Sequence, residues 1–238
     1  MTTFEEAWAT AAKVEGWLLP EQGHALFCAA ATVPVGLSAV EIGSHRGKSA
    51  TLIALGLRDG VRLTAVDPFD DPRWGGGPES LSIFQANMAT AGVTERVDLF
   101  RGLSSEASAS WRGPKVGLLW VDGAHDKAST LQDFDGWLPH MAPGGLLYVH
   151  DAFSAVGTTQ AVLRRFWFSR RVQYLGCERT LVMFRIKPLS FSERLISGVQ
   201  LSRRLPFFAR VVAIKLARRR GLHTMERRFM KMDNEPLI

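Results

Sequence analysis

Short apolar segments alternate with amphipathic stretches along most of the chain, and each apolar segment ends beside a polar or charged residue. Five such segments follow one another, at 38–42, 62–66, 97–100, 116–121 and 146–150. Apolar runs of this length, separated by helical stretches, are typical of buried parallel strands. The pattern predicts an α/β protein with an open, doubly wound sheet whose ligands gather at the carboxyl ends of the strands.

Helices are expected between these strands and on both sides of the sheet. The predicted stretches are 48–57, 80–91, 105–111, 126–138 and 156–168, preceded by one or two helices over 4–33 that break near Pro20. Residues 171–176 and 180–186 alternate as an antiparallel hairpin does. Pro206 is expected to begin a last helix. The chain is therefore divided into an N-terminal helical segment (1–36), a sheet domain (37–187) and a helical extension (188–238).

The most informative segment is the turn after the first predicted strand, where residues 41–49 read E-I-G-S-H-R-G-K-S. A P-loop needs four residues between its first glycine and Gly-Lys-Ser, and here only three separate Gly43 from Gly47. A dinucleotide fingerprint needs a second glycine where His45 stands. The remaining pattern, E-x-G-x-x-x-G-x-S, suits an adenosine-type ligand or is an ordinary strand-to-helix turn of an α/β protein.

This pattern resembles the first motif of class I S-adenosylmethionine-dependent methyltransferases, and the order of predicted elements over about 37–187 resembles their seven-stranded sheet. The resemblance implies that Glu41 and Gly43 lie at the methionine part of S-adenosylmethionine and that Asp67 holds the ribose hydroxyls. Ser104 and Ser105 are expected at the adenine edge, although a helix N-cap explains a serine there equally well. The other residues expected to bind the cofactor are Ser44, Gly47, Ser49 and Asp122.

Two carboxylates and two imidazoles follow the fourth and fifth predicted strands. Asp122 and His125 come after the fourth strand, and His150 and Asp151 end the fifth. Central strands bring such residues to one cleft, where two carboxylates and an imidazole suit a divalent cation such as Mg²⁺. His125 and His150 are both candidate bases, because imidazole accepts protons near neutral pH. His125 is favoured slightly, since it precedes the helix over the site.

The D-G-x-H segment followed by P-G-G resembles small sugar O-methyltransferases, including the macrocin-type and actinobacterial polysaccharide enzymes. The resemblance implies a metal held by Asp122, His150 and Asp151, with Asp122, His125 and His150 as catalytic residues. The family usually has two acids at the second position, and here the pair is His150 and Asp151. Catechol-type relatives place asparagine directly after the acid, where this chain has Ala152.

Charge changes the picture only at the C-terminus. The chain has 238 residues and a net charge of +6, but residues 1–187 hold 18 Lys and Arg against 19 Asp and Glu. Residues 188–238 hold 11 against 4. A neutral body argues against nucleic acid as a partner. The basic tail, with Phe207, Val211 and Ile214 on one helical face, suits either an anionic membrane surface or docking on the body or on a second copy.

The leading hypothesis is an S-adenosylmethionine-dependent O-methyltransferase, assisted by Mg²⁺, acting on a hydroxyl of a sugar or glycoside. The expected acceptor is a small molecule or an oligosaccharide. No apolar run reaches the roughly 20 residues of a membrane span, so a cytoplasmic protein is expected, with peripheral membrane contact left open. Two alternatives stay open: methylation of a phenolic or lipid hydroxyl, and a catalytically silent fold that serves as a membrane-associated binding module.

Overall fold

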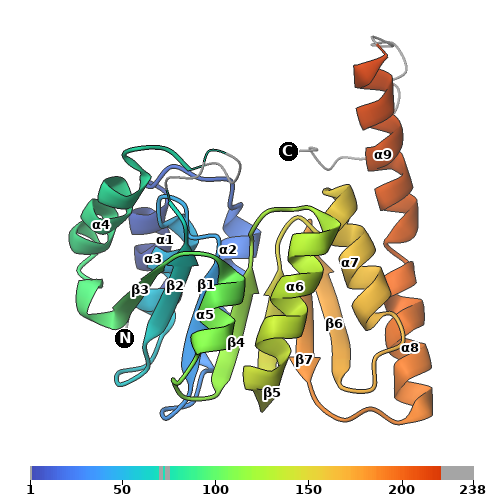
Figure 1. The fold of residues 1–238 in the computed structure, drawn as a ribbon, viewed down its shortest axis with the longest axis horizontal. Coiled ribbons are helices and arrows are strands. Elements are labelled where there is room, and N and C mark those ends of the chain that lie inside the picture. The colour runs from blue at the N-terminus through green and yellow to red at the C-terminus, as the bar shows by residue number, and fades with distance from the viewer. Residues whose placement is uncertain (1, 70–71, 73–75, 221–238) are drawn as a thin grey trace.

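The computed structural model describes residues 2–69, 72 and 76–220, which form one seven-stranded sheet with helices on both faces (Figure 1). The strand order is β3-β2-β1-β4-β5-β7-β6. The first five strands pair in parallel, and β7 is antiparallel to both β5 and β6. The strands are β1 Ser38–Ile42, β2 Leu63–Asp67, β3 Val97–Arg101, β4 Val116–Val121, β5 Met141–Val149, β6 Val172–Glu178 and β7 Leu181–Ile186.

The predicted fold class is therefore confirmed, including the terminal hairpin. The largest difference is in β5, which begins at Met141 rather than at Leu146. Pro143 and Gly144 had suggested a turn before the strand, but the chain accommodates them within it, where the pairing of β4 with β5 shifts register between Val116 and Leu118. An irregularity of this kind is where a strand tolerates proline and glycine.

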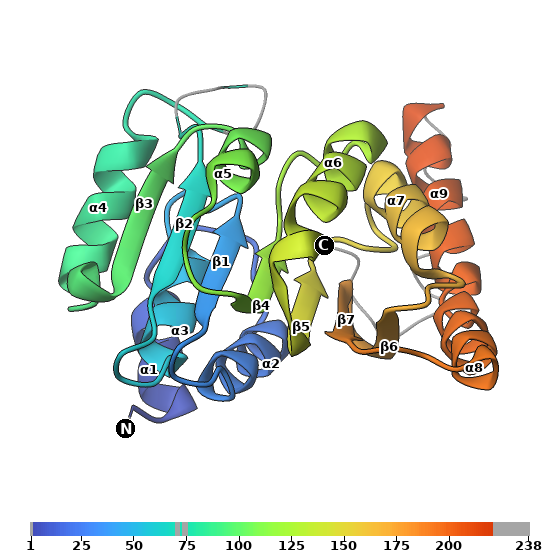
Figure 2. The ribbon, with the colours of Figure 1, turned by 60° about the horizontal axis from the view of Figure 1, so that its bottom comes forward.

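Each face of the sheet is covered by its own group of helices (Figure 2). Helices α1 Phe4–Ala11, α2 Pro20–Ala31, α3 Lys48–Gly56 and α4 Ser80–Thr90 share one apolar core with residues such as Ala39 and Trp120. Helices α5 Ser104–Ser110, α6 Lys127–Trp137 and α7 Val156–Phe166 share the other with Val40 and Val121. Side chains alternate along a strand, so Glu41 faces the α1–α3 side while its neighbours Val40 and Ile42 face the α5–α7 side.

The C-terminal extension forms two helices, α8 Phe191–Ser202 and α9 Leu205–Arg219. The sequence pattern had indicated only the second, whose Pro206 lies in its first turn. Helix α8 packs on the hairpin, where Ser197 Oγ accepts a hydrogen bond from the Tyr174 backbone N–H at 2.8 Å and Leu201 is buried. Helix α9 continues beyond the carboxyl ends of the strands (Figure 1). The extension therefore reaches the edge of the sheet where ligands bind in this fold class.

Backbone hydrogen bonds continue one residue past several strands and align their ends. Gly43 N–H donates to Val66 O at 2.9 Å, Asp122 N–H to Ile42 O at 2.9 Å, and His150 N–H to Val121 O at 3.0 Å. Gly43 has φ +86°, and a Cβ placed on it would lie 2.1 Å from Asp122 O. Only glycine allows the ends of β1 and β4 to approach this closely.

Two further expectations from the sequence concern the loop after β2 and membrane-spanning helices. In the sequence, the loop 68–78 combines Trp74 with three consecutive glycines, which favours either a lid or an ordinary surface loop. Residues 70, 71 and 73–75, Trp74 included, lie outside the described residues. Among the residues that the structure does describe, no helix is long and apolar enough to cross a membrane.

The substitution Gly43→Ala tests the close approach of β1 and β4. Gly92 also has positive φ, but a Cβ there would meet nothing within 4 Å, so Gly92→Ala measures backbone strain alone. We expect Gly92→Ala to lower the free energy of unfolding by about 1–2 kcal/mol. Gly43→Ala is expected to cost about 1–3 kcal/mol more, because the backbone of β4 must move. Equal losses in urea unfolding of the two variants would contradict this account.

Candidate functional site

Two cavities open at the carboxyl ends of the strands and meet at Gly43, Asp122 and His125. The β2-side cavity, of about 440 Å³, lies along the ends of β1, β2 and β4; the hairpin-side cavity, of about 530 Å³, reaches toward β7, α7 and α9. The β2-side cavity is lined by residues that include Val66, Asp67, Leu103, Ser104, Ser105, Gln132 and Asp133. The hairpin-side cavity is lined by residues that include Ser44, Ser49, His150, Asp151, Ser154, Thr180, Phe207 and Lys215.

The glycine turn forms the ridge between the cavities. The Asp67 carboxylate, at the end of β2, accepts hydrogen bonds from the backbone N–H groups of His45 at 2.8 Å and Phe69 at 2.5 Å. Burial raises the pKa of Asp67, and these hydrogen bonds lower it in part. His45 adopts φ +47°, a left-handed conformation that a non-glycine residue holds only when its surroundings impose it. The acid predicted to bind ribose therefore also fixes the turn.

The Glu41 side chain lies beneath this turn and is fully buried. Within the part of the chain that the structure describes, neither of its carboxylate oxygens, nor Ser44 Oγ, has a hydrogen-bond partner. Burial raises the pKa of Glu41 to about 8, although the nearby Ser44 and Ser49 hydroxyls lower it in part and the charges of Asp122 and Asp67 raise it further. A buried carboxyl group without a partner is costly, so this position is suited to a ligand that brings a positive charge nearby.

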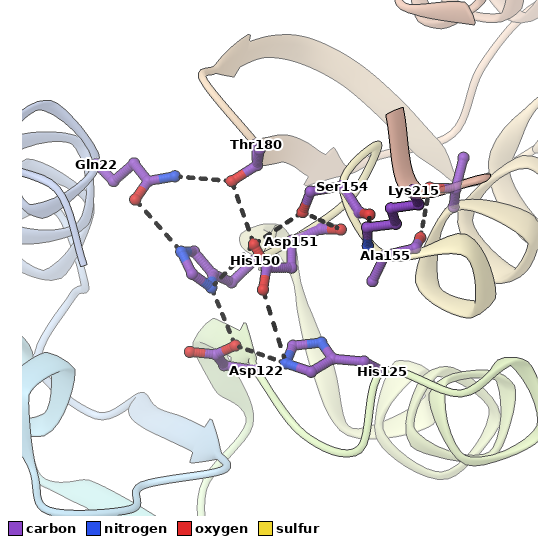
Figure 3. Close-up of polar contacts among 10 residues, drawn as sticks. Gln22, Asp122, His125, His150, Asp151, Ser154, Ala155, Thr180 and Lys215 are labelled. Atoms are coloured by element: carbon purple, nitrogen blue, oxygen red, sulfur yellow. Dashed lines mark hydrogen bonds and ion pairs between the residues drawn. The ribbon is translucent and has the colours of Figure 1, made fainter. Parts of the chain in front are cut away.

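A buried imidazole connects the hairpin-side cavity to helix α2 (Figure 3). His150 Nδ1 lies 3.0 Å from Asp122 Oδ1, and His150 Nε2 lies 3.3 Å from Gln22 Oε1. The orientation of the Gln22 amide is fixed, because its Oε1 accepts the Leu19 N–H at 3.1 Å and its Nε2 donates to Thr180 Oγ1 at 3.1 Å. Both nitrogens of His150 therefore face acceptors, which only a doubly protonated imidazolium satisfies.

The electrostatics of the site agree with this geometry. Burial lowers the pKa of His150, but the charge of Asp122, its hydrogen bond to the ring and the charge of Asp151 outweigh burial and raise that pKa to about 9. Burial alone would raise the pKa of Asp151, yet the positive charges of His150 and His125 and hydrogen bonds from Ser154 and Thr180 hold it below its usual value. His150 is thus a fixed positive charge beside two carboxylates.

His125 occupies a different position at the junction of the two cavities. Its Nε2 lies 3.8 Å from Asp122 Oδ1 and 3.8 Å from Asp151 Oδ2, and its side chain is 41% exposed. Both His125 and Asp151 adopt left-handed backbone conformations, with φ +53° and +52°. Backbone strain of this kind is often concentrated at functional sites. The ring of His125 therefore lies within ion-pair distance of two carboxylates.

The three residues predicted to hold a metal, Asp122, His150 and Asp151, do come together. Over residues 2–69, 72 and 76–220, however, no group of three or more His, Cys, Asp or Glu is arranged to hold a metal ion. The donor chemistry gives the reason: an imidazolium with both nitrogens protonated has no lone pair for a metal, and Mg²⁺ prefers oxygen ligands. The donor atoms of these residues, as arranged, therefore do not fit Mg²⁺.

The predicted cofactor residues divide between the two cavities. Gly43, Asp67, Ser104, Ser105 and Asp122 line the β2-side cavity, as expected for one ligand lying across the strand ends. Ser44 and Ser49 line the hairpin-side cavity, while Glu41 and Gly47 line neither. Gly47 instead begins α3 with φ +91°.

Four residues of the site were not singled out from the sequence: Trp17, Gln22, Asp133 and Thr180. Asp133 lies in the β2-side cavity, and burial raises its pKa to about 6, with Ser104 lowering it in part. Its signal was available, because Thr130, Asp133, Phe134 and Trp137 share the buried face of α6, where a carboxylate is out of place. Trp17, Gln22 and Thr180 reach the site only through tertiary packing and left no such signal.

A comparison with family models gives one match: residues 40–152 match a model described as a methyltransferase domain. The observed strand order agrees with this match, since it is that of the Rossmann-like methyltransferase fold. The matched region begins in β1, before the glycine turn, and ends just past Asp151. It therefore contains Glu41, Asp67, Asp122, His125 and His150.

Solved structures share this fold at low sequence identity. An O-methyltransferase from Bacillus cereus in complex with SAH is 17% identical, with a TM-score of 0.61, covering 77% of this chain and 90% of its own. The O-methyltransferase TomG from Streptomyces achromogenes, in complex with SAM, is 17% identical, with a TM-score of 0.60 and coverages of 78% and 89%. Cofactor-bound Rv0187 from MTB is 16% identical, with a TM-score of 0.62 and coverages of 76% and 87%.

Glu41→Gln tests the buried carboxyl group through the pH dependence of stability. The pKa of Glu41 in the folded protein, about 8, lies above the ordinary 4.5, so its contribution to stability is present below about pH 4.5 and is lost as the pH rises through 8. Each proton involved changes the free energy of unfolding by about 1.4 kcal/mol per pH unit. We expect urea unfolding between pH 5.5 and 7.5 to show a shallower decline for Glu41→Gln than for the wild type.

The exposed Glu95 provides the matched control, since Glu95→Gln makes the same charge change at a solvent-facing position. The wild-type slope should persist in that variant. If Glu41→Gln and Glu95→Gln give the same slope as the wild type, Glu41 is not the group that titrates.

Proposed function

We propose that this methyltransferase domain transfers the methyl group of S-adenosylmethionine to a hydroxyl oxygen of a sugar or glycoside. The observation that carries the proposal is the position of His125, whose Nε2 faces two carboxylates where the two cavities meet. A hydroxyl acceptor must lose its proton as it reacts, and a base is needed at that point.

The β2-side cavity supports binding of the cofactor. Asp67 would hold the ribose hydroxyls with the lone pairs that the backbone N–H groups leave free, and Ser104, Ser105 and Asp133 lie on the adenine side. Gly43 lines this cavity, and the neighbouring Glu41 has a carboxyl group without a hydrogen-bond partner, suited to the positive charges of the methionine part. When bound, S-adenosylmethionine supplies a methyl group on a positively charged sulfur.

The roles of the two histidines follow from their protonation. His150 carries protons on both ring nitrogens, so it cannot accept another. Its charge holds Asp122 in place. His125 Nε2 is placed to accept the hydroxyl proton of the acceptor, and the resulting imidazolium lies 3.8 Å from both Asp122 and Asp151. His125 is therefore the proposed base, and His150 the positioning residue.

Trp17 supports a sugar as the acceptor. Its side chain is largely exposed, at 69%, and it lines both cavities, with its ring 5.6 Å from that of His45. An exposed aromatic ring beside polar groups such as Ser154 and Thr180 offers an apolar surface for the C–H face of a sugar and hydrogen-bond partners for its hydroxyls. Methylation of a phenolic or lipid hydroxyl is the second candidate.

Magnesium, expected from the resemblance, is not part of this proposal, because the donor set does not fit it. The first experiment is calorimetric titration of the protein with S-adenosylhomocysteine, followed by methyl-transfer assays on panels of sugars and phenols with EDTA or with Mg²⁺. We expect micromolar binding, corresponding to about −8 kcal/mol, and transfer to sugars. The rate in EDTA is expected to stay within about twofold of the rate in Mg²⁺, because a protein base supplies the proton acceptor.

Each possible result tests a different part of the proposal. No binding of S-adenosylhomocysteine would contradict the methyltransferase function of this chain. Transfer to phenols alone would replace the sugar with the second candidate. Activity that EDTA abolishes and Mg²⁺ restores would contradict the metal-free mechanism.

His125→Ala removes the proposed base. We expect the turnover number to fall about 10²–10⁴-fold, the usual contribution of a general base, while the affinity for S-adenosylhomocysteine changes little. The exposed His24 provides the control, since it lies outside both cavities and His24→Ala should leave turnover unchanged. Unaltered turnover in His125→Ala, at saturating acceptor and neutral pH, would remove His125 from the reaction.

A further inference from the structure

Helix α9 forms one wall of the hairpin-side cavity. Five of its residues line that cavity, and their spacing places them on a single helical face: Phe207, Val211, Ile214, Lys215 and Arg218. Val211 and Ile214 are buried, and Phe207 is half-buried. The apolar face that made this helix a candidate for membrane contact is thus turned toward the cavity in which the acceptor is proposed to bind.

The cationic end of this wall lies close to the catalytic groups. Lys215 Nζ donates a hydrogen bond to Ser154 O at 2.7 Å, and Ser154 Oγ donates to Asp151 Oδ1 at 2.9 Å (Figure 3). Arg218 lines the cavity one helical turn farther along α9 than Ile214. The ammonium group of Lys215 is therefore held at the cavity by a backbone carbonyl, which leaves its positive charge uncompensated by that contact.

Over the rest of the cavity lining, lysines and arginines equal the carboxylates in number, so the surplus of positive charge comes from Lys215 and Arg218 on α9. Arg46, Lys48 and Arg179 line it, together with the carboxylates of Glu15, Asp122 and Asp151. Glu15 is paired with Arg46, and both aspartates face His125 and His150. Lys48 Nζ, like that of Lys215, donates to a backbone carbonyl, that of Gly16, at 3.1 Å. Arg179 is paired with Glu21 at 3.5 Å, so Lys48 and Lys215, whose ammonium groups contact backbone carbonyls, are the cations left to meet an anionic ligand.

We infer that the acceptor glycoside is an acidic amphiphile, in which an anionic group such as a phosphate or carboxylate binds the lysines of the cavity and an apolar group lies against Phe207, Val211 and Ile214. This inference names the acceptor class for the proposed function and rests on it. Its physical basis is that a cavity with surplus positive charge and one apolar wall selects a ligand with both features. Helix α9 then determines acceptor specificity.

The test measures binding of three probes that separate these features, by calorimetry with the free protein and with the protein saturated with S-adenosylhomocysteine. Octyl phosphate carries both features, octyl glucoside is apolar without charge, and glucose 6-phosphate is charged without an apolar chain. We expect octyl phosphate to bind at least about tenfold more tightly than octyl glucoside, because hydrogen bonds to charged groups are the stronger ones. Glucose 6-phosphate should bind more weakly than octyl phosphate but lose affinity with it in the charge-reversal variant.

The variant is Lys215→Glu, and its control is Arg219→Glu, which makes a comparable charge reversal on α9 at an exposed position outside the cavity lining. Lys215→Glu is expected to weaken octyl phosphate binding at least about tenfold and leave octyl glucoside within about twofold. Arg219→Glu should change neither by more than about twofold, because Arg219 does not line the cavity and salt screens its charge at a distance. Lys215→Met, which keeps the apolar stem, should lose part of the phosphate affinity.

Three results would overturn the inference: octyl glucoside binding as tightly as octyl phosphate, equal effects of Lys215→Glu and Arg219→Glu, or binding of octyl phosphate only at another site in a competition assay with the acceptor. Failure of S-adenosylhomocysteine to bind would instead contradict the proposed function. The two failures are distinguishable, since the probes are also titrated into the free protein.

Discussion

The buried His150 imidazolium is the interaction on which the site depends. A positive charge with 5% exposure is tolerated only when each of its protons has a partner. Asp122 at the end of β4 supplies one partner and Gln22 in α2 the other, while Thr180 beside β7 holds the Gln22 amide in the required orientation. This requirement ties the N-terminal helices and the hairpin to the centre of the sheet.

The same charge separates the functions of the residues around it. The charge of His150 helps to lower the pKa of Asp151, and both Asp122 and Asp151 lie 3.8 Å from Nε2 of the more exposed His125. The cavity on one side of this centre has the acids and serines expected to hold S-adenosylmethionine, and the cavity on the other side has Trp17, the lysines and helix α9. Methyl transfer would take place where the two meet, with its proton acceptor already in position.

The sheet alone does not identify the acceptor, because one fold can support many different functions. The acceptor must therefore be argued from the cavity rather than from the sheet. In this chain, the hairpin-side cavity is lined in part by residues outside the matched region. Trp17 lies before that region, and Thr180 and α9 lie after it. The segments that vary around a common sheet are those that meet the acceptor.

The sequence by itself determined the sheet and the side of it where chemistry occurs. Apolar runs predicted β1 and β4 to the residue, because burial on both faces leaves little choice of side chain. The polar residues at the end of β2 and after β4 marked Asp67, Asp122 and His125 as candidates. Only the tertiary structure decided what those residues do. Both ring nitrogens of the expected metal ligand His150 face oxygen acceptors. One of these acceptors belongs to Gln22, 128 positions away in the sequence, and no local pattern encodes that contact.

The face of α9 was likewise visible in the sequence as apolar and basic. Whether it meets a membrane, a second copy or the body depends on how α8 and the hairpin place the helix, which is a property of packing across the whole fold.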